Sequence, residues 1–428
     1  MRQAMSADFE GRLQRYAEAA IVGGLNLRPG QRLLVIGPRI TGGVSHEALP
    51  LVRALTSSAY RAGSPLVEVL WGDEAMQLIR FREAGADSFS QFSSWLPKAL
   101  IEHIEGGHAL LSVYANDPDL LAGVPPERVA SLQQASSRGL QQFSELIGRN
   151  ATNWLVVSAS AERWAAKVFP SLAPADAAER LWAAIFDMCR IAPIADGADA
   201  GAAWARHLDT LVHRSDFLNA RRYRALRYRG PGTDLTIGLP DGHLWVSGRS
   251  VSAQGITFAP NMPTEEVFTM PHRDRVDGIV RSTKPLSYAG VTIEDFSLRF
   301  EKGRAVEARA VRGEEVLRSM IASDEGAARL GEIALVPHSS PISQSGLLFY
   351  NTLFDENAAS HLAVGSAYRF TMQGGETMSD DAFAAAGGNR SIIHVDFMIG
   401  NGALDIDGEL ADGASEPVMR AGEWSAVL

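Results

Sequence analysis

The periodicity of the apolar segments changes along the chain, and this change limits the folds that the sequence can adopt. Residues 1–190 alternate helix-like segments with short apolar runs at 32–37, 65–71, 109–114 and 154–158. Strands that alternate with helices are typical of a parallel sheet with crossover helices. The first 190 residues are therefore predicted to form an α/β domain with a largely parallel sheet.

The pattern differs after a helical region at about 174–225. From RYRGPGTDLTIGLP onwards, short runs such as HLWVSG and GVTIEDFSLRFEKGRAVEARA are separated by Gly, Pro and Asp, which indicates mainly antiparallel β-structure. Two helices are expected to interrupt these strands, at EEVLRSMIASDEGAARL and near FDENAASHLAVGSA. Residues 191–428 are therefore predicted to form a second, α+β domain.

The composition narrows the possible partners and compartments. A net charge of −10 and scattered arginines argue against nucleic acid as a partner. The single cysteine, Cys189, excludes an intramolecular disulfide framework, fits a reducing cytoplasm and is interpreted as a buried small side chain. The N-terminus lacks the apolar core of a secretion signal, and no apolar run reaches the length of a membrane span. We therefore expect a cytoplasmic protein with no membrane partner.

The segment SIIHVDFMIG, at residues 391–400, combines an apolar strand pattern with two polar side chains. Side chains alternate between the faces of a strand, so His394 and Asp396 point to one face and Val395 and Phe397 to the other. Burying an imidazole and a carboxylate costs on the order of several kcal/mol unless they are paired or bind a metal. Taken alone, the segment leaves open both a His–Asp pair in a core and a metal site.

Further polar residues recur inside apolar segments of the C-terminal half: Glu265, Glu266, Glu332, Glu356, His361 and Tyr368. Taken singly, each has an ordinary structural explanation, such as a turn cap or a solvated helix residue. Together with His394 and Asp396 they supply carboxylates and imidazoles without thiolates. That mixture suits two divalent ions that share a bridging carboxylate, as in dinuclear hydrolases.

Three long stretches contain these positions: PNMPTEEVFTMPHRDRVDGIVRSTKPLSYAG, LGEIALVPHSSPISQSGLLFYNTLFDENAASHLAVGSAY and NRSIIHVDFMIG. They resemble the thermophilic metallo-aminopeptidases, the group that contains aminopeptidases T and S. The segments AGVPPERVASLQQ, ERWAAKVFP and GPGTDLTIGLPDGHLW are also similar to that family, whereas the first 110 residues match more loosely.

The resemblance implies a set of metal ligands, namely Glu266, Glu332, His361, His394 and Asp396. It also places Tyr368 beside the metals and implies a homodimer. Glu356 is expected to be a further ligand or a catalytic carboxylate. The choice of Glu266 over its neighbour Glu265 rests on the spacing alone.

These observations predict a metal-dependent aminopeptidase that acts on peptides with a free N-terminus and holds two divalent ions, Zn, Co or Mn, per subunit. Tyr368 could donate a hydrogen bond to the oxyanion, and Glu356 or Glu265 could carry the proton to the leaving amine. One alternative is a dinuclear hydrolase of another bond, such as a phosphoester or an amide, with Lys284 and Arg390 as lone phosphate-binding candidates. The other is a non-catalytic binding protein stabilised by metal, although structural sites prefer cysteine ligands.

Overall fold

The computed structural model describes residues 7–38, 42–192, 200–288 and 291–425. The chain divides into two compact units. The first comprises Met1–Leu208, Arg249–Pro263 and Leu348–Asn351, and the second comprises Asp209–Gly248, Thr264–Leu347 and Thr352–Leu428. The boundary proposed from the sequence, between residues 190 and 191, precedes helix α9 (Ala200–Arg221), which contributes residues to both units.

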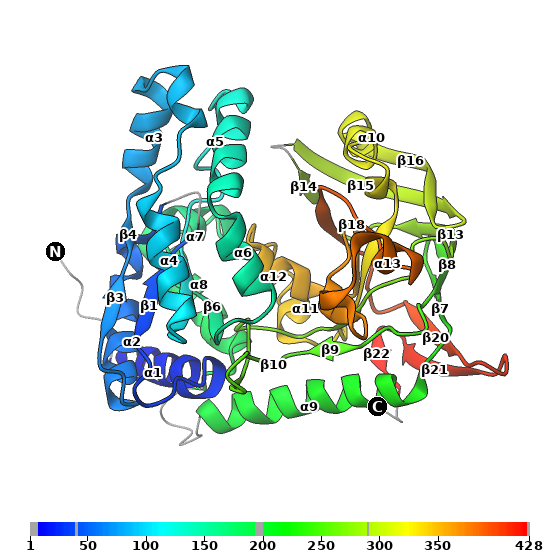
Figure 1. Cartoon of the computed structure of the whole chain (residues 1–428), viewed down its shortest axis with the longest axis horizontal. Helices are drawn as coiled ribbons and strands as arrows, with labels where there is room; N and C mark the ends of the chain where they lie inside the picture. Colours follow the sequence, from blue (N-terminus) through cyan, green and yellow to red (C-terminus); the bar gives the residue numbers. More distant parts are fainter. Residues whose placement is uncertain (1–6, 39–41, 193–199, 289–290, 426–428) are drawn as a thin grey trace. The chain divides into compact units, whose positions relative to one another are not determined.

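A four-stranded parallel sheet forms the centre of the first unit. Its strands coincide with the four apolar runs of the sequence and lie in the order β3 (Val67–Val69), β1 (Leu33–Ile36), β5 (Ala109–Tyr114) and β6 (Trp154–Ser158) (Figure 1). Helices α4 (Trp95–Glu105) and α6 (Gln141–Gly148) pack apolar side chains against one face of this sheet. The prediction of an α/β domain with parallel strands is confirmed.

The other described elements of the first unit surround this sheet or precede its strands. They are α1 (Ala7–Glu18), the π-helix η1 (Ala19–Gly24), β2 (Val44–Ser45), α2 (Leu49–Arg61), β4 (Trp71–Gly72), α3 (Glu74–Glu83), α5 (Pro126–Gly139), α7 (Glu162–Val168), α8 (Pro174–Met188), β10 (Ser250–Val251) and β11 (Thr257–Phe258). Cys189 follows α8 and is buried, as interpreted from the sequence. Among the described helices, none is long and apolar enough to cross a bilayer.

The second unit contains a nine-stranded antiparallel sheet. Its strands follow the order β14 (Leu286–Tyr288), β15 (Val291–Glu301), β13 (Val276–Arg281), β8 (Thr233–Gly238), β7 (Ala225–Gly230), β20 (Asp405–Glu409), β21 (Ser415–Arg420) and β22 (Glu423–Trp424), with β16 (Arg304–Arg312) paired to β15. Helix α10 (Glu314–Ile321) begins at the first of the two expected interruptions and buries Leu317 and Met320.

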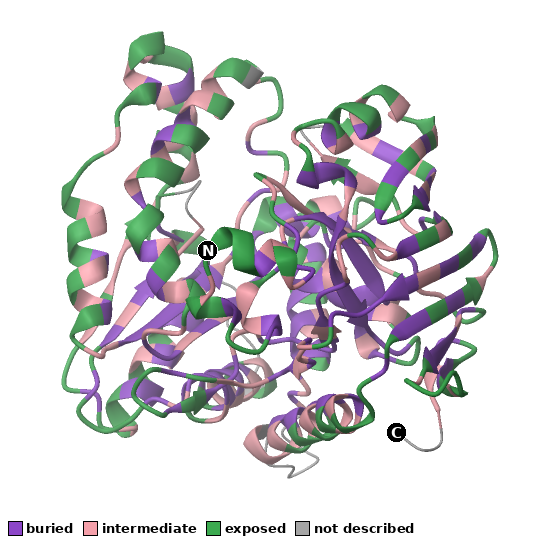
Figure 2. Ribbon diagram, turned by 45° about the vertical axis from the view of Figure 1, so that its right-hand side comes forward, coloured by how far each residue is buried: buried purple, intermediate pink, exposed green. Residues whose placement is uncertain are grey.

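A five-stranded antiparallel sheet lies in the same unit and carries the polar residues singled out above. Its order is β19 (His394–Met398), β18 (His361–Gly365), β17 (Leu330–Leu335), β12 (Val267–Thr269) and β9 (Val246–Ser247). Strands β17 and β18 are buried along their whole length, whereas β19 is mostly half-buried; Figure 2 shows the burial of each residue along the ribbon. Short helices α11 (Pro341–Ser345), α12 (Thr352–Asp355) and α13 (Asp380–Ala385) connect the strands. The expected α+β second half with mainly antiparallel strands is confirmed.

The second expected helix, near FDENAASHLAVGSA, is only partly present. Helix α12 ends at Asp355, the 3-10 turn η7 (Glu356–Ala358) follows, and residues 361–365 form strand β18. Every residue of β18 is buried, so both faces of this strand are covered. A strand buried on both faces is continuously apolar and does not show alternation, so its sequence is easily mistaken for a helix.

Candidate metal centre

The five-stranded sheet separates an apolar face from a polar one. Val267, Ile333, Leu335, Leu362, Val364 and Phe397 point into the hydrophobic core of the second unit. The side chains that alternate with them point to the opposite face. In β19 this places His394 and Asp396 together and away from the core, as the alternation in SIIHVDFMIG predicts.

The pairing of the strands sets which side chains of the polar face become neighbours. Glu332 of β17 lies opposite Ala363 of β18, which in turn lies opposite Asp396 of β19. Two pairs further along, and so on the same face, His361 lies opposite Ala334. The two alanines on this face leave room for the longer side chains beside them. Carboxylates and imidazoles from three strands therefore converge on one region of the sheet.

The converging side chains form two groups that could each hold a metal ion, and Glu332 belongs to both. In the first group, His361 Nε2 lies 3.3 Å from Glu266 Oε2 and 3.6 Å from Glu332 Oε1. In the second, His394 Nε2 lies 3.5 Å from Glu332 Oε2 and 3.4 Å from Asp396 Oδ1. Each oxygen of Glu332 therefore faces a different imidazole, which is the arrangement expected of a bridging carboxylate.

Both imidazoles are oriented by backbone carbonyls. His361 Nδ1 lies 3.1 Å from the carbonyl oxygen of Ala359, and His394 Nδ1 lies 2.7 Å from that of Ser366. A carbonyl can only accept, so in the neutral ring Nδ1 carries the proton and Nε2 keeps its lone pair toward the carboxylates. Such a contact on the second ring nitrogen is typical of metal-binding histidines.

The ionisation of these groups shows how strongly their charges interact. Burial, opposed by the imidazole of His361, raises the pKa of Glu332 to about 7. Burial by itself would lower the pKa of His394, but Asp396 and Glu332 outweigh it and raise this pKa to about 9. Burial and its carboxylate neighbours act on His361 in the same opposing way, and its pKa also rises. The carboxylates thus favour positive charge at the centre.

Glu356 and Tyr368 lie beside the two groups without belonging to either. Burial, followed by the charges of Glu266 and Asp396, raises the pKa of Glu356 well above its usual range. Tyr368 follows β18 and its ring centroid lies 4.8 Å from that of His394. Desolvation by the protein around the phenol, followed by the charge of Glu332, raises the pKa of Tyr368, so the hydroxyl stays protonated and can donate a hydrogen bond.

Glu265 is buried beside Glu266 but is not in either ligand group. Its backbone N–H donates to Asn357 Oδ1 over 2.7 Å, and Asn357 Nδ2 donates to the carbonyl of Leu353 over 3.1 Å. The buried amide of Asn357 thereby ties the segment that carries Glu266 to the turn that carries Glu356. The sequence pattern did not indicate Asn357; the only available signal was an amide directly after the candidate carboxylate Glu356.

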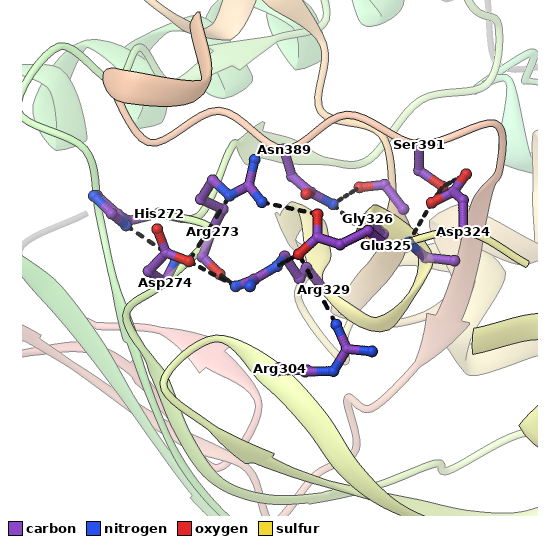
Figure 3. Close-up of polar contacts among 12 residues, drawn as sticks. His272, Arg273, Asp274, Arg304, Asp324, Glu325, Gly326, Arg329, Asn389 and Ser391 are labelled. Atoms are coloured by element: carbon purple, nitrogen blue, oxygen red, sulfur yellow. Dashed lines mark hydrogen bonds and ion pairs between the residues drawn. The ribbon is translucent and has the colours of Figure 1, made fainter. Parts of the chain in front are cut away.

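A polar network supports the segments that lead into β17 and β19 (Figure 3). The Asp324 carboxylate accepts hydrogen bonds from the backbone N–H of Ile392 over 2.6 Å and from the Ser391 hydroxyl over 3.0 Å. Asn389 Nδ2 donates to the carbonyls of Gly326 and Gly365 over 2.8 and 2.6 Å. These contacts fix the chain directly before His394, and nothing in the sequence pattern pointed to them.

The residues present fit divalent cations. The donor set consists of carboxylate oxygens and imidazole nitrogens, which bind Zn, Co and Mn ions. Among the described residues, Asp396 Oδ1 accepts no hydrogen bond of good geometry and faces His394 Nε2 over 3.4 Å. An acceptor left without a donor beside two imidazoles and a second carboxylate is the type of atom that a cation satisfies.

Over nearly its whole length the chain is similar to known metallopeptidases and aminopeptidases. Residues 9–424 match the family described as thermophilic metalloprotease (M29). Aminopeptidase 2 of Geobacillus stearothermophilus is 44% identical over 420 residues, which cover 98% of this chain and 99% of that protein. Aminopeptidase T of Thermus thermophilus is 44% identical over 416 residues, covering 97% and 99%.

The fold of the chain is also similar to that of solved structures. Wild-type AmpT from Thermus thermophilus superposes with a TM-score of 0.89 at 44% identity, covering 98% of this chain and 100% of that one. A 2,5-dihydroxypyridine dioxygenase from Pseudomonas putida has a TM-score of 0.50 at 14% identity and shares the fold alone.

Proposed function

The chain belongs to the thermophilic metalloprotease family M29, and on this premise we propose that it is a metal-dependent aminopeptidase that hydrolyses the N-terminal residue from peptides. The relatives that match nearly its whole length are named aminopeptidases. The cluster of carboxylates and imidazoles supplies the ligands that a metallopeptidase requires.

The observation that carries the proposal is the position of Glu332 between two imidazoles, with one oxygen toward each. It supports two divalent ions per chain, held by Glu266, Glu332, His361, His394 and Asp396. Divalent ions bound there would lower the pKa of a water molecule toward neutrality and polarise the scissile carbonyl. Zn, Co and Mn all suit this donor set, so we propose one of these metals.

The residues beside the ligands have roles that follow from their protonation. Tyr368 keeps its phenolic proton and can donate a hydrogen bond to the oxyanion that develops on the carbonyl oxygen. Glu356 would act either as a further metal ligand or as a free carboxyl group; in the second role its raised pKa lets it hold a proton and pass it to the leaving amine. Remaining negative charge at the site would attract the α-ammonium group of the substrate.

Neither alternative function has comparable support. A phosphoesterase needs clustered cations, but Arg390 pairs with Asp380 over 2.7 Å, and burial lowers the pKa of Lys284. A purely structural metal site is typically closed by cysteine ligands, and the lone cysteine of this chain lies in the first unit.

Metal analysis combined with an aminopeptidase assay tests the proposal. We expect the purified protein to contain divalent metal, to lose activity on aminoacyl amides after treatment with a chelator, and to regain it when Co, Zn or Mn is added back. A chelator already saturated with calcium is the control. Full activity in protein shown to be free of metal would contradict the proposal.

We further propose that the protein forms a homodimer, because the family resemblance implies one. We also propose that it is cytoplasmic, because a chain of this length with a single cysteine fits a reducing compartment. The β-rich half, which has edge strands to cover, is the expected interface. Light scattering at micromolar concentration should give twice the 46.1 kDa mass of the chain. A mass equal to one chain would remove this part of the proposal.

A further inference from the structure

Three aromatic side chains form a contiguous apolar surface beside the metal centre. The rings of Tyr368 and Phe370 stack with their centroids 5.2 Å apart and their planes at 20°. Phe268 meets both rings edge-on, at 6.4 Å from Tyr368 and 6.2 Å from Phe370. We call Phe268, Tyr368 and Phe370 the aromatic shelf.

The shelf is continuous with the proposed ligands. At one end, the Tyr368 ring lies 4.8 Å from the imidazole of His394. At the other end, Phe268 lies two residues after Glu266 and opposite Ala334, which itself lies opposite His361. Phe268 therefore belongs to the polar face of the sheet, whereas its neighbour Val267 is buried in the core.

The shelf is also open. The side chain of Tyr368 is 43% exposed, and Phe268 and Phe370 are only partly buried. Partly exposed aromatic rings that touch one another expose a larger contiguous apolar area than a single side chain does. Contiguous apolar surface of this kind is often functional. An occupant that covered these rings would gain hydrophobic free energy in proportion to the area removed from water.

We propose that the aromatic shelf binds the side chain of the substrate's N-terminal residue and makes the enzyme selective for apolar residues such as Leu and Phe. This inference rests on the proposed aminopeptidase function. The carbonyl that is cleaved must lie at the ligands, so the side chain of the same residue extends only a few ångströms from them. The shelf borders the ligands within that reach.

The charges around the shelf favour an apolar occupant over a cationic one. Arg369 lies between Tyr368 and Phe370 in the sequence and forms an ion pair with Asp380. Arg390 pairs with the same carboxylate over 2.7 Å. Two guanidinium groups thus already share the Asp380 carboxylate, which leaves it little capacity to pair with a cationic substrate side chain.

Phe370 is the best residue to change, because it belongs to the shelf but does not contact His394 and is not next to a ligand in sequence. The probes are aminoacyl amides with one leaving group and Ala, Leu, Phe or Arg as the N-terminal residue. For the wild-type protein loaded with metal, we expect kcat/KM for Leu and Phe to exceed that for Ala by about 10- to 100-fold. Phe370→Ala should lower the Leu and Phe values by about tenfold and change the Ala value less than about twofold.

Two further variants keep the test decisive. Phe370→Leu retains an apolar side chain and should keep most of the preference for Leu and Phe amides over the Ala amide. Val311→Ala, at an exposed apolar position of β16, should leave kcat/KM unchanged for every amide. Metal content and binding of the product amino acids, measured by calorimetry, report on the site independently of turnover. Phenylalanine should bind wild type more tightly than alanine does, and Phe370→Ala should remove that difference.

The outcomes separate the two claims. Cleavage with no preference among the amides, a preference for Arg over Leu, or an equal loss for all substrates in Phe370→Ala would overturn the shelf while leaving the aminopeptidase intact. If metal-loaded wild type cleaved none of the amides, the proposed function would fail and the shelf with it.

Discussion

Glu332 joins the two proposed ligand groups, so its loss should affect the centre more than the loss of any other ligand. In Glu332→Gln one oxygen is replaced by an amide that cannot bridge two cations, and we expect the metal content to fall from about two ions per chain toward zero. His394→Ala removes a ligand of one group only and should lose at least one metal ion. Elemental analysis of the dialysed proteins measures both effects.

Glu376→Gln provides the matched control, because Glu376 is an exposed carboxylate outside both groups. Its metal content and activity should equal those of wild type. If His394→Ala kept both its full metal content and its full activity, the assignment of the centre would be wrong.

The hydroxyl of Tyr368 can be tested separately from its ring. Tyr368→Phe keeps the aromatic shelf but removes the hydrogen-bond donor proposed for the oxyanion. We expect kcat to fall by about 10²- to 10³-fold, with KM and metal content nearly unchanged, because the bond forms mainly in the transition state. Steady-state kinetics on a leucine amide, with metal analysis of the same sample, gives the answer. An unchanged kcat would exclude this role.

Part of the centre could be predicted from single residues, and part could not. The alternation in SIIHVDFMIG was sufficient to place His394 and Asp396 on one face, because the period of a strand is local information. The shared position of Glu332 depends on which strands are neighbours and on their register, which residue spacing does not encode. For the same reason the place of Phe268 beside the centre cannot be predicted from its position in the sequence.

At the scale of elements, the apolar runs and turn residues predicted the parallel sheet and some of the antiparallel strands, such as β15, β16 and β19. The prediction of a helix at β18 was wrong, because a strand buried on both faces lacks the polar–apolar alternation that marks a strand. It also could not give the order β19, β18, β17, β12 and β9, since pairing between distant segments depends on the packing of the whole unit. The ligands come together because of that order.

The segment before β19 should depend on Asp324, whose carboxylate fixes the turn that leads to His394 (Figure 3). Burial raises the pKa of Asp324, but hydrogen bonds from Ile392 and Ser391 outweigh it and lower this pKa. Asp324→Asn should therefore reduce the free energy of unfolding by about 1 kcal/mol or more at pH 7. Chemical denaturation of both proteins measures the difference.

The pH dependence of this difference has a definite sign. A carboxylate with a lowered pKa stabilises the fold above its ordinary pKa and loses this contribution as the pH falls through its value in the folded protein. The difference between wild type and Asp324→Asn should thus be constant from pH 8 to 5 and shrink only below about pH 4. Asp216→Asn, at an exposed position of α9, should show no such difference. A difference that grew in acid would contradict the role of Asp324.

At the scale of the whole molecule, the chain builds two units by passing between them more than once. Residues 249–263 and 348–351 belong to the first unit although the segments on either side of each belong to the second. The pattern of apolar runs changes once along the sequence, so it indicates two kinds of structure but gives no sign of these returns. The proposed ligands lie in the second unit alone.

The activity of the whole enzyme should require a free α-amine. Carboxylates surround the proposed ions, so the centre keeps acidic groups that can meet the ammonium of an N-terminal residue. N-acetylation removes both that charge and the amine lone pair that could bind metal. We expect leucine, arginine and phenylalanine amides to be cleaved and their acetylated forms to react slower by on the order of 10³-fold, the loss of one strong charged contact. Liquid chromatography of paired reactions, with the free amide of the same residue as control, measures the ratio. Equal turnover of blocked and free substrates would indicate an endopeptidase or another amide hydrolase, even if the metal content matched the expectation.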